Sequence, residues 1–139
     1  MTLILTLDIN DGMLFNSRRQ TRDRAVYERI LLKFTGRSIR MNEYSAPLFK
    51  DSVSLSISVG DFENVEADDV LFIENTPPES FAQKADTIII YRWDKVYPSD
   101  LKADTTTLLR DFTNAENTEF KGFSHDKITE EIWYRNESK

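Results

Sequence analysis

The sequence predicts a single α/β domain spanning residues 1–139, in which helices flank a mixed, mostly parallel sheet that ends in a C-terminal antiparallel hairpin. Two observations carry this prediction. Short apolar runs alternate with helical segments through the first two thirds of the chain, which is typical of parallel strands joined by helices. The last third contains strand-like segments with no helix between them, and such neighbours usually pair antiparallel.

The first strand and the first helix are the best-marked elements. Residues 3–8 form an apolar run that ends at Asn10-Asp11-Gly12, and this composition predicts a buried strand followed by a tight turn. Residues 23–34 carry apolar side chains at helical spacing, and Gly36 follows as a stop. The sequence therefore opens with a strand and an amphipathic helix.

The remaining elements follow from the same rules. Apolar and polar residues alternate over 53–59, which predicts a half-buried strand. Two prolines at the start of 77–84 predict a helix there, because proline fits the first turn. Further strands are expected over 38–41, 70–73, 87–91, 107–112 and 128–135, and a short helix or turn over 45–49.

Composition excludes several kinds of site. The sequence has no cysteine and one histidine, so disulfides, thiolate metal sites and multi-histidine metal sites are impossible, and we expect no metal. The net charge is −6 and the isoelectric point is near 4.8, which argues against nonspecific binding to nucleic acid or to an anionic membrane. We expect a cytoplasmic protein with no nucleic-acid or membrane partner.

Positive charge is concentrated before the first helix and at its start. Arg18, Arg19 and Arg22 lie there, at the end of a helix where backbone N–H groups favour anions. Guanidinium groups bind phosphate or carboxylate through paired hydrogen bonds, so these three are candidate ligand-binding residues. The alternative is a solvated loop whose ion pairs reach the acidic C-terminal half, including across a homodimer interface.

Asp23 is the candidate catalytic residue. A carboxylate at the start of a helix, beside a pocket lined by Tyr27 and Phe15, can hydrogen-bond the edge of an amidine or of a pterin-like ring. An N-cap is the alternative role, because aspartate is favoured at that position. His125 lies between two predicted hairpin strands, where we expect a surface-loop histidine.

The succession of elements resembles dihydrofolate reductase in a shortened form, over the length of the chain. The opening LILTLDINDGMLFN is similar to that family's first strand and mobile loop, and RDRAVYERILLKF is similar to its first helix. The segments PPESFAQKADTIIIYRW and KITEEIWYRN are similar to a later helix with its strand and to the closing hairpin. The resemblance implies a dihydrofolate reductase-like fold and places Asp23 where the family has its substrate-binding carboxylate.

The sequence departs from that family where the family binds NADPH. Glu43 lies in the segment that matches a phosphate-binding segment, and Glu74-Asn75 replace paired glycines that let the backbone approach a pyrophosphate. We therefore expect no cofactor, and a protein that binds a pterin- or nucleotide-like small molecule. The alternatives are a divergent NADPH-dependent reductase of the dihydrofolate or riboflavin-pathway type, and a dimeric protein-interaction module.

The motif NDGMLFNSRRQTRD also resembles short bacterial proteins that carry a ribonuclease Z label. Metal-dependent ribonuclease chemistry of that kind needs clustered histidines and carboxylates to hold paired metals, and this sequence has only His125. We therefore do not expect that activity.

Overall fold

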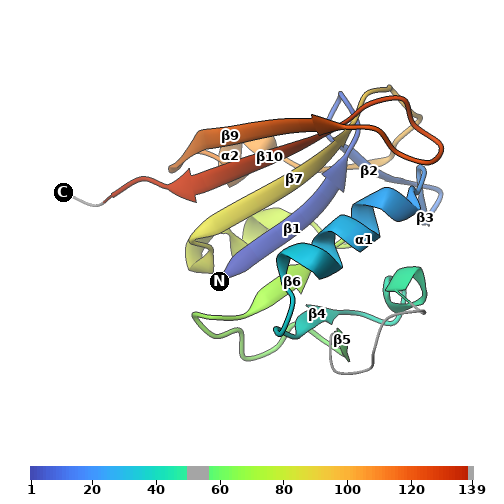
Figure 1. The fold of residues 1–139 in the computed structure, drawn as a ribbon. Helices are drawn as coiled ribbons and strands as arrows, with labels where there is room; N and C mark the ends of the chain where they lie inside the picture. The colour runs from blue at the N-terminus through green and yellow to red at the C-terminus, as the bar shows by residue number, and fades with distance from the viewer. Residues whose placement is uncertain (50–56, 138–139) are drawn as a thin grey trace.

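The computed structural model describes residues 1–49 and 57–137. Within these residues a seven-stranded sheet has the order β5-β4-β6-β1-β7-β10-β9 (Figure 1). Its strands are β1 (Thr2–Leu7), β4 (Ile39–Met41), β5 (Ile57–Val59), β6 (Val70–Phe72), β7 (Thr87–Trp93), β9 (Phe112–Phe120) and β10 (Ile128–Arg135).

The sheet is parallel on one side and antiparallel at the other. β1 lies between β6 and β7 and is parallel to both, so that Leu3 is paired with Leu71 on one side and with Ile88 on the other. β10 is antiparallel to β7 and also to β9, which forms the edge. This arrangement confirms the predicted fold class, and it places β1 and β7 in the sheet interior.

Helices cover both faces of the sheet. On one face lie α1 (Arg24–Lys33) and the 3₁₀ helix η1 (Ala46–Phe49), and on the other lie η3 (Pro78–Lys84) and α2 (Thr105–Leu108) (Figure 1). Side chains alternate along β1, so Ile4 packs in the core under α1 whereas Leu3 and Leu5 pack in the opposite core. Two apolar cores therefore hold the helices to one sheet, and each fully buried Leu or Ile contributes about 1.5–3 kcal/mol.

The start of α1 and its attachment to the sheet are both polar. Asp23 is the N-cap and accepts a hydrogen bond from the backbone of Ala25. Further along α1, Arg29 donates two hydrogen bonds to the buried carboxylate of Glu130 on β10, and the hydroxyl of Tyr91 donates a third. The helix is thus fixed at its N-cap and near its middle.

A second, three-stranded sheet has the order β3-β2-β8, formed by β3 (Arg18–Arg19), β2 (Gly12–Phe15) and β8 (Leu101–Lys102). Asn16 and Ser17 both have positive φ angles, 50° and 61°, which is the requirement of a two-residue type I′ hairpin turn. The segment that resembles a mobile loop of dihydrofolate reductase is therefore a β-hairpin. This hairpin carries the arginine-rich segment toward α1.

The prediction of a strand over 107–112 is wrong. The β-branched threonines there favour a strand by propensity, but Asp104 accepts hydrogen bonds from the backbone and side chain of Thr107 and caps the short helix α2 instead. β9 then begins at Phe112 and is an exposed polar edge strand. Of the expected strand over 53–59, β5 is described and 53–56 lies outside the described residues. No helix in the described ranges is long and apolar enough to cross a membrane.

Candidate functional site

Three neighbouring cavities surround the segment from the β2–β3 hairpin to the start of α1. The helix cavity lies between α1 and η1 and has a volume of about 650 Å³; it is lined by Arg22, Asp23, Arg24, Tyr27, Glu28, Leu31, Pro47, Leu48, Phe49 and Ser124. The hairpin cavity, of about 550 Å³, is lined by Phe15, Asn16, Arg18, Arg19, Gln20, Tyr97 and Pro98. The arginine cavity, of about 400 Å³, is lined by Arg18, Arg19, Thr21, Arg22 and Tyr44.

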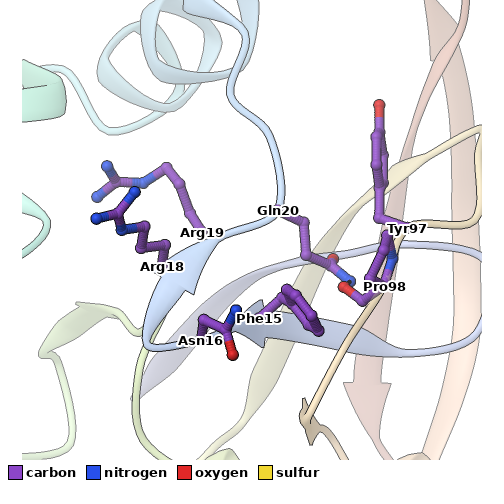
Figure 2. A pocket seen from close by; sticks show the side chains of 7 residues that line it. All are labelled: Phe15, Asn16, Arg18, Arg19, Gln20, Tyr97 and Pro98. Carbon is purple, nitrogen blue, oxygen red and sulfur yellow. Dashed lines mark hydrogen bonds between the residues drawn. The ribbon is translucent and has the colours of Figure 1, made fainter.

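The arginine side chains turn away from the aromatic side of the hairpin cavity. Figure 2 shows Arg18 and Arg19 extending in one direction while Phe15 lies on the other side, nearer Tyr97. In the same view the hydroxyl group of Tyr97 points away from the rest of the cavity. Arg18 and Arg19 line the arginine cavity as well as the hairpin cavity, whereas Phe15, which is 41% exposed, lines the hairpin cavity alone among the three.

Asp23 is surrounded by hydrogen-bond donors from its own chain. Its Oδ1 accepts from the backbone N–H groups of Ala25 at 2.9 Å and Phe123 at 3.0 Å. Its Oδ2 accepts from the Ser124 backbone at 2.8 Å and the Ser124 hydroxyl at 3.1 Å, and lies 3.0 Å from His125 Nδ1. A carboxylate has about four lone-pair sites, so these five donors leave none for a ligand.

This environment fixes the charge of Asp23. Burial alone would raise the pKa of the carboxyl group, but the donors from Phe123, His125 and Ser124 outweigh burial and hold the pKa well below its usual value. Asp23 is therefore ionised at neutral pH and is not a proton donor there. Its geometry is that of an N-cap that also holds the loop between β9 and β10.

Gly122 allows that loop to reach Asp23. A Cβ atom at Gly122 would lie 2.2 Å from Asp23 Oδ2 and 2.8 Å from Ile128 Cδ1. No real Cβ atom makes contacts that short, so a larger residue would push the loop off the carboxylate. The glycine is thus a requirement of the site.

His125 is buried, which corrects the expectation of a surface-loop histidine. Its residue exposure is 5%, and its ring stacks on Trp93 with centroids 4.7 Å apart. Because ionised Asp23 can only accept, Nδ1 carries a proton, and Nε2 is the ring nitrogen left for other contacts. Nε2 lies 3.1 Å from the Tyr97 hydroxyl and 3.3 Å from the Thr21 hydroxyl. His125 therefore connects the start of α1 with the turn after β7.

The second polar centre is the buried carboxylate of Glu74, directly after β6. It accepts hydrogen bonds at 3.0 Å from both Nε and Nη2 of Arg19, and at 2.7 Å from the Ser45 hydroxyl. The guanidinium group also lies over the ring of Tyr44, 4.4 Å from its centroid. Burial alone would lower the pKa of Arg19, but its hydrogen bonds to Glu74 outweigh burial and raise it. The charge of Arg19 is thus neutralised inside the protein.

The turn after β1 is held by an internal carboxylate. Asp8 is buried, and its Oδ1 accepts from the backbone of Asn10 and Gly12, both at 2.8 Å. Its Oδ2 accepts from Gln20 Nε2 and from the Tyr97 backbone. The residues are therefore arranged as a side-chain-stabilised turn. The described ranges contain no group of three or more His, Asp or Glu side chains placed to hold a metal ion.

The candidate residues are divided between the cavities. Asp23, Tyr27 and Arg22 line the helix cavity, whereas Phe15, Arg18 and Arg19 line the hairpin cavity. Three features of the site were not predicted from the sequence. One is the contact of His125 with Asp23, 102 residues away, and another is the pair of hydroxyl groups near His125 Nε2. The third is the ion pair between Glu74 and Arg19. No local pattern could have identified them, because each contact joins distant parts of the chain.

Comparisons with known proteins give a fold and no sequence family. Neither the family models nor the curated proteins contain a match to this sequence. Among solved structures, the chain is similar to dihydrofolate reductase from Enterococcus faecalis in complex with NADP(H) and RAB-propyl, with a TM-score of 0.64. The match covers 98% of this chain and 96% of that one, at 7% sequence identity. At that identity the likeness concerns the fold alone: this chain has a dihydrofolate reductase-like fold.

Proposed function

We propose that this protein binds a small planar ring compound, of pterin or nucleotide type, in the helix cavity and does so without a nicotinamide cofactor. The observation that carries the proposal is that the lining of this cavity combines a set of apolar side chains, called here the wall, with a set of polar side chains, called here the rim. The wall consists of Tyr27, Leu31, Pro47, Leu48 and Phe49, and the rim of Arg22, Arg24, Glu28 and Ser124. Small-molecule sites commonly have this size and this combination.

The aromatic part of the wall is packed edge to face. The rings of Tyr27 and Phe49 have centroids 5.4 Å apart, and both contact Phe72 beneath them in the same manner. Such packing fixes the wall before a ligand arrives, which lowers the entropic cost of binding. Burial, followed by the charge of Glu74, raises the pKa of the Tyr27 hydroxyl, so it stays protonated at neutral pH.

Asp23 has no free carboxylate oxygen to offer a ligand, and it contributes to the helix cavity by holding neighbouring residues in place. Its oxygens are fully used by the backbone of Ala25 and by the loop donors from Phe123, Ser124 and His125. Holding Ser124 beside the rim is therefore its proposed role. The chemistry that faces a ligand belongs to the rim: two guanidinium groups, one carboxylate and one hydroxyl.

The residues at the expected cofactor position do not fit a dinucleotide. A pyrophosphate needs an open backbone cradle with positive or N–H donors, but Glu74 places a buried carboxylate there. Ser45 and Arg19 already surround that carboxylate, and Asn42 donates to Asn75 at 2.6 Å across the ends of β4 and β6. These contacts support the proposal that no nicotinamide cofactor binds, and with it that hydride transfer is not the activity.

A thermal-shift titration with NADPH, NADP, dihydrofolate and a set of nucleotides tests the proposal. A specific ligand at a hundredfold excess over its Kd stabilises a protein by about 2.7 kcal/mol. We expect stabilisation by a pterin or nucleotide and none by NADPH beyond that of NADP. A reductase is indicated instead if NADPH stabilises and is oxidised in the presence of dihydrofolate.

Two leucines of α1 give a matched pair of variants. Leu31 lines the helix cavity, whereas its neighbour Leu32 is 78% exposed. Leu31→Gln should abolish the shift caused by the ligand, and Leu32→Gln should leave it unchanged. A ligand whose effect survives Leu31→Gln binds elsewhere, and that result would remove the helix cavity from the proposal.

A further inference from the structure

We propose that the arginine cavity binds a phosphate group, through the guanidinium groups of Arg18 and Arg22 and the hydroxyl group of Thr21. This deepens the proposed function, because it names the ligand class as a phosphorylated compound whose ring occupies the helix cavity. Only the joining of phosphate and ring rests on the proposed function. The phosphate site itself depends only on the residues that line the arginine cavity.

The arginine cavity is positively charged. Three guanidinium groups line the arginine cavity, and no carboxylate lines it. Arg19 is neutralised by Glu74. The side chains of Arg18 and Arg22 form no ion pair and no hydrogen bond within residues 1–49 and 57–137. Two uncompensated positive charges therefore face one small cavity, and a divalent anion with several acceptor oxygens complements them.

Arg19 forms a fixed wall of the arginine cavity, although its charge is compensated by Glu74. Its guanidinium group is fixed by two hydrogen bonds to Glu74 and by a third to the backbone carbonyl of Tyr44 at 3.1 Å. The Tyr44 hydroxyl in turn accepts from the Arg19 backbone at 2.6 Å. One wall of the cavity is thus held in place, while Arg18 and Arg22 are free to turn toward an anion.

Thr21 supplies a donor, because His125 cannot use both hydroxyl groups near it. Nε2 has a single hydrogen-bonding position in the plane of the ring, and the hydroxyl groups of Tyr97 and Thr21 lie 3.1 Å and 3.3 Å from it. When Tyr97 is hydrogen-bonded to Nε2, the Thr21 hydroxyl group is not. It can then donate its hydrogen into the arginine cavity, which Thr21 lines. A phosphate oxygen can then accept it.

Arg22 connects this site with the helix cavity, since it lines both. A phosphorylated ring compound can therefore place its ring against Tyr27 and its phosphate against Arg22. The helix cavity provides the apolar wall and Arg22, and the arginine cavity adds the second unpaired cation, Arg18. This arrangement accounts for a basic segment in a protein that is acidic overall.

The test is calorimetric titration of the full chain with inorganic phosphate, with sodium chloride at matched ionic strength as the reference. We expect phosphate binding that Arg18→Ala and Arg22→Ala each weaken by about tenfold or more. Arg110→Ala is the matched control, because Arg110 is exposed and lies outside all three cavities. Phosphate binding no stronger than chloride, or unchanged in both Arg18→Ala and Arg22→Ala, would overturn the proposal.

Further variants test the hydroxyl argument and the identity of the anion. Thr21→Val should weaken phosphate binding several-fold, and Thr21→Ser should restore it. Tyr97→Phe leaves Thr21 as the donor to His125, so this variant should also weaken phosphate binding with both arginines intact. Wild-type affinity in Thr21→Val and in Tyr97→Phe removes Thr21 from the site. If acetate binds as tightly as phosphate, the site does not select phosphate and the ligand group is a carboxylate instead.

The outcome is separable from that of the proposed function. Inorganic phosphate contains no ring, so its binding is independent of the helix cavity, and Leu31→Gln should leave it unchanged. If phosphate binds and no ring compound does, the phosphate site stands and the proposed function fails. If ring compounds bind and phosphate does not, the reverse holds.

Discussion

Nδ1 of His125 lies 3.0 Å from Oδ2 of Asp23, across a separation of 102 residues in the sequence. The same carboxylate caps α1 through the backbone of Ala25. One side chain therefore sets both where α1 begins and where the loop between β9 and β10 lies. Loss of this carboxylate should affect both parts together.

Asp23→Asn is expected to lower the free energy of unfolding by about 3 kcal/mol, because the amide group places a donor against the loop donors from Ser124 and His125. Asparagine caps helices nearly as well as aspartate, so the loss of stability comes from the broken contacts with the loop at 122–125 and not from the helix cap. Urea unfolding measures it. The control is Asp104→Asn at the exposed cap of α2, which should cost far less. Similar losses in both variants would show that Asp23 acts only as a cap.

Gly122→Ala should destabilise the protein more than Gly36→Ala. At Gly122 the new Cβ would lie 2.2 Å from Asp23 Oδ2, whereas at Gly36 it would meet no atom within 4 Å and would cost only the strain of a positive φ, about 1–2 kcal/mol. Thermal unfolding of the two variants compares them. If the losses are equal, the loop does not approach Asp23 as closely as described.

Arg19→Met should lower the free energy of unfolding by about 3–5 kcal/mol, because it leaves the buried carboxylate of Glu74 without its partner. The double variant Arg19→Met with Glu74→Gln should recover part of that loss, since no buried charge then lacks a partner. A double-mutant cycle gives the coupling. Additive losses would mean that the two residues do not interact.

The protein should lose stability in acid through Asp23 and Glu130. Burial alone would raise the pKa of the Glu130 carboxyl group, but hydrogen bonds from Arg29 and Tyr91 outweigh burial and lower it; the pKa of Asp23 is lowered as well. A lowered pKa in the folded state gives stability that is complete above the ordinary values of 3.8 and 4.5 and is lost as the pH falls further.

Urea unfolding across this acid range checks the prediction. Glu130→Gln removes one of the two titrating groups, so its stability should fall less steeply with decreasing pH than that of the wild type. The variant is expected to be less stable at neutral pH, where the wild-type contacts of the ionised carboxylate are complete. Parallel pH dependences in the two proteins would contradict a lowered pKa at Glu130.

Much of the fold could be predicted because its information is local. The apolar run of β1, the helical spacing of α1 and the pattern of β10 each identify an element on its own. β9 could not be identified in the same way. It is an edge strand with most residues exposed, so neither alternation nor apolar content marks it, and its pairing with β10 determines its conformation.

The site was less predictable because its contacts are between distant residues. The sequence indicated Asp23 as either a ligand-binding carboxylate or a cap, and could not show that the loop at 122–125 supplies the remaining donors. His125 appeared as a polar loop residue because its surroundings, Trp93 and Tyr97, come from another strand and its turn. Likewise, Glu74 was recognisable as an obstacle to phosphate, but its pairing with Arg19 was not.

The position of His125 between the last two strands of the sheet has a consequence for synthesis on the ribosome. α1 and its arginines emerge early, but Asp23 receives its loop donors only after β9 has emerged and β10 has inserted beside β7. Until then the nascent chain exposes the edge of β7 and a partly unsatisfied helix start, a state prone to association with other chains. Completion of the contacts around Asp23 and protection of the edge of β7 therefore both depend on β10.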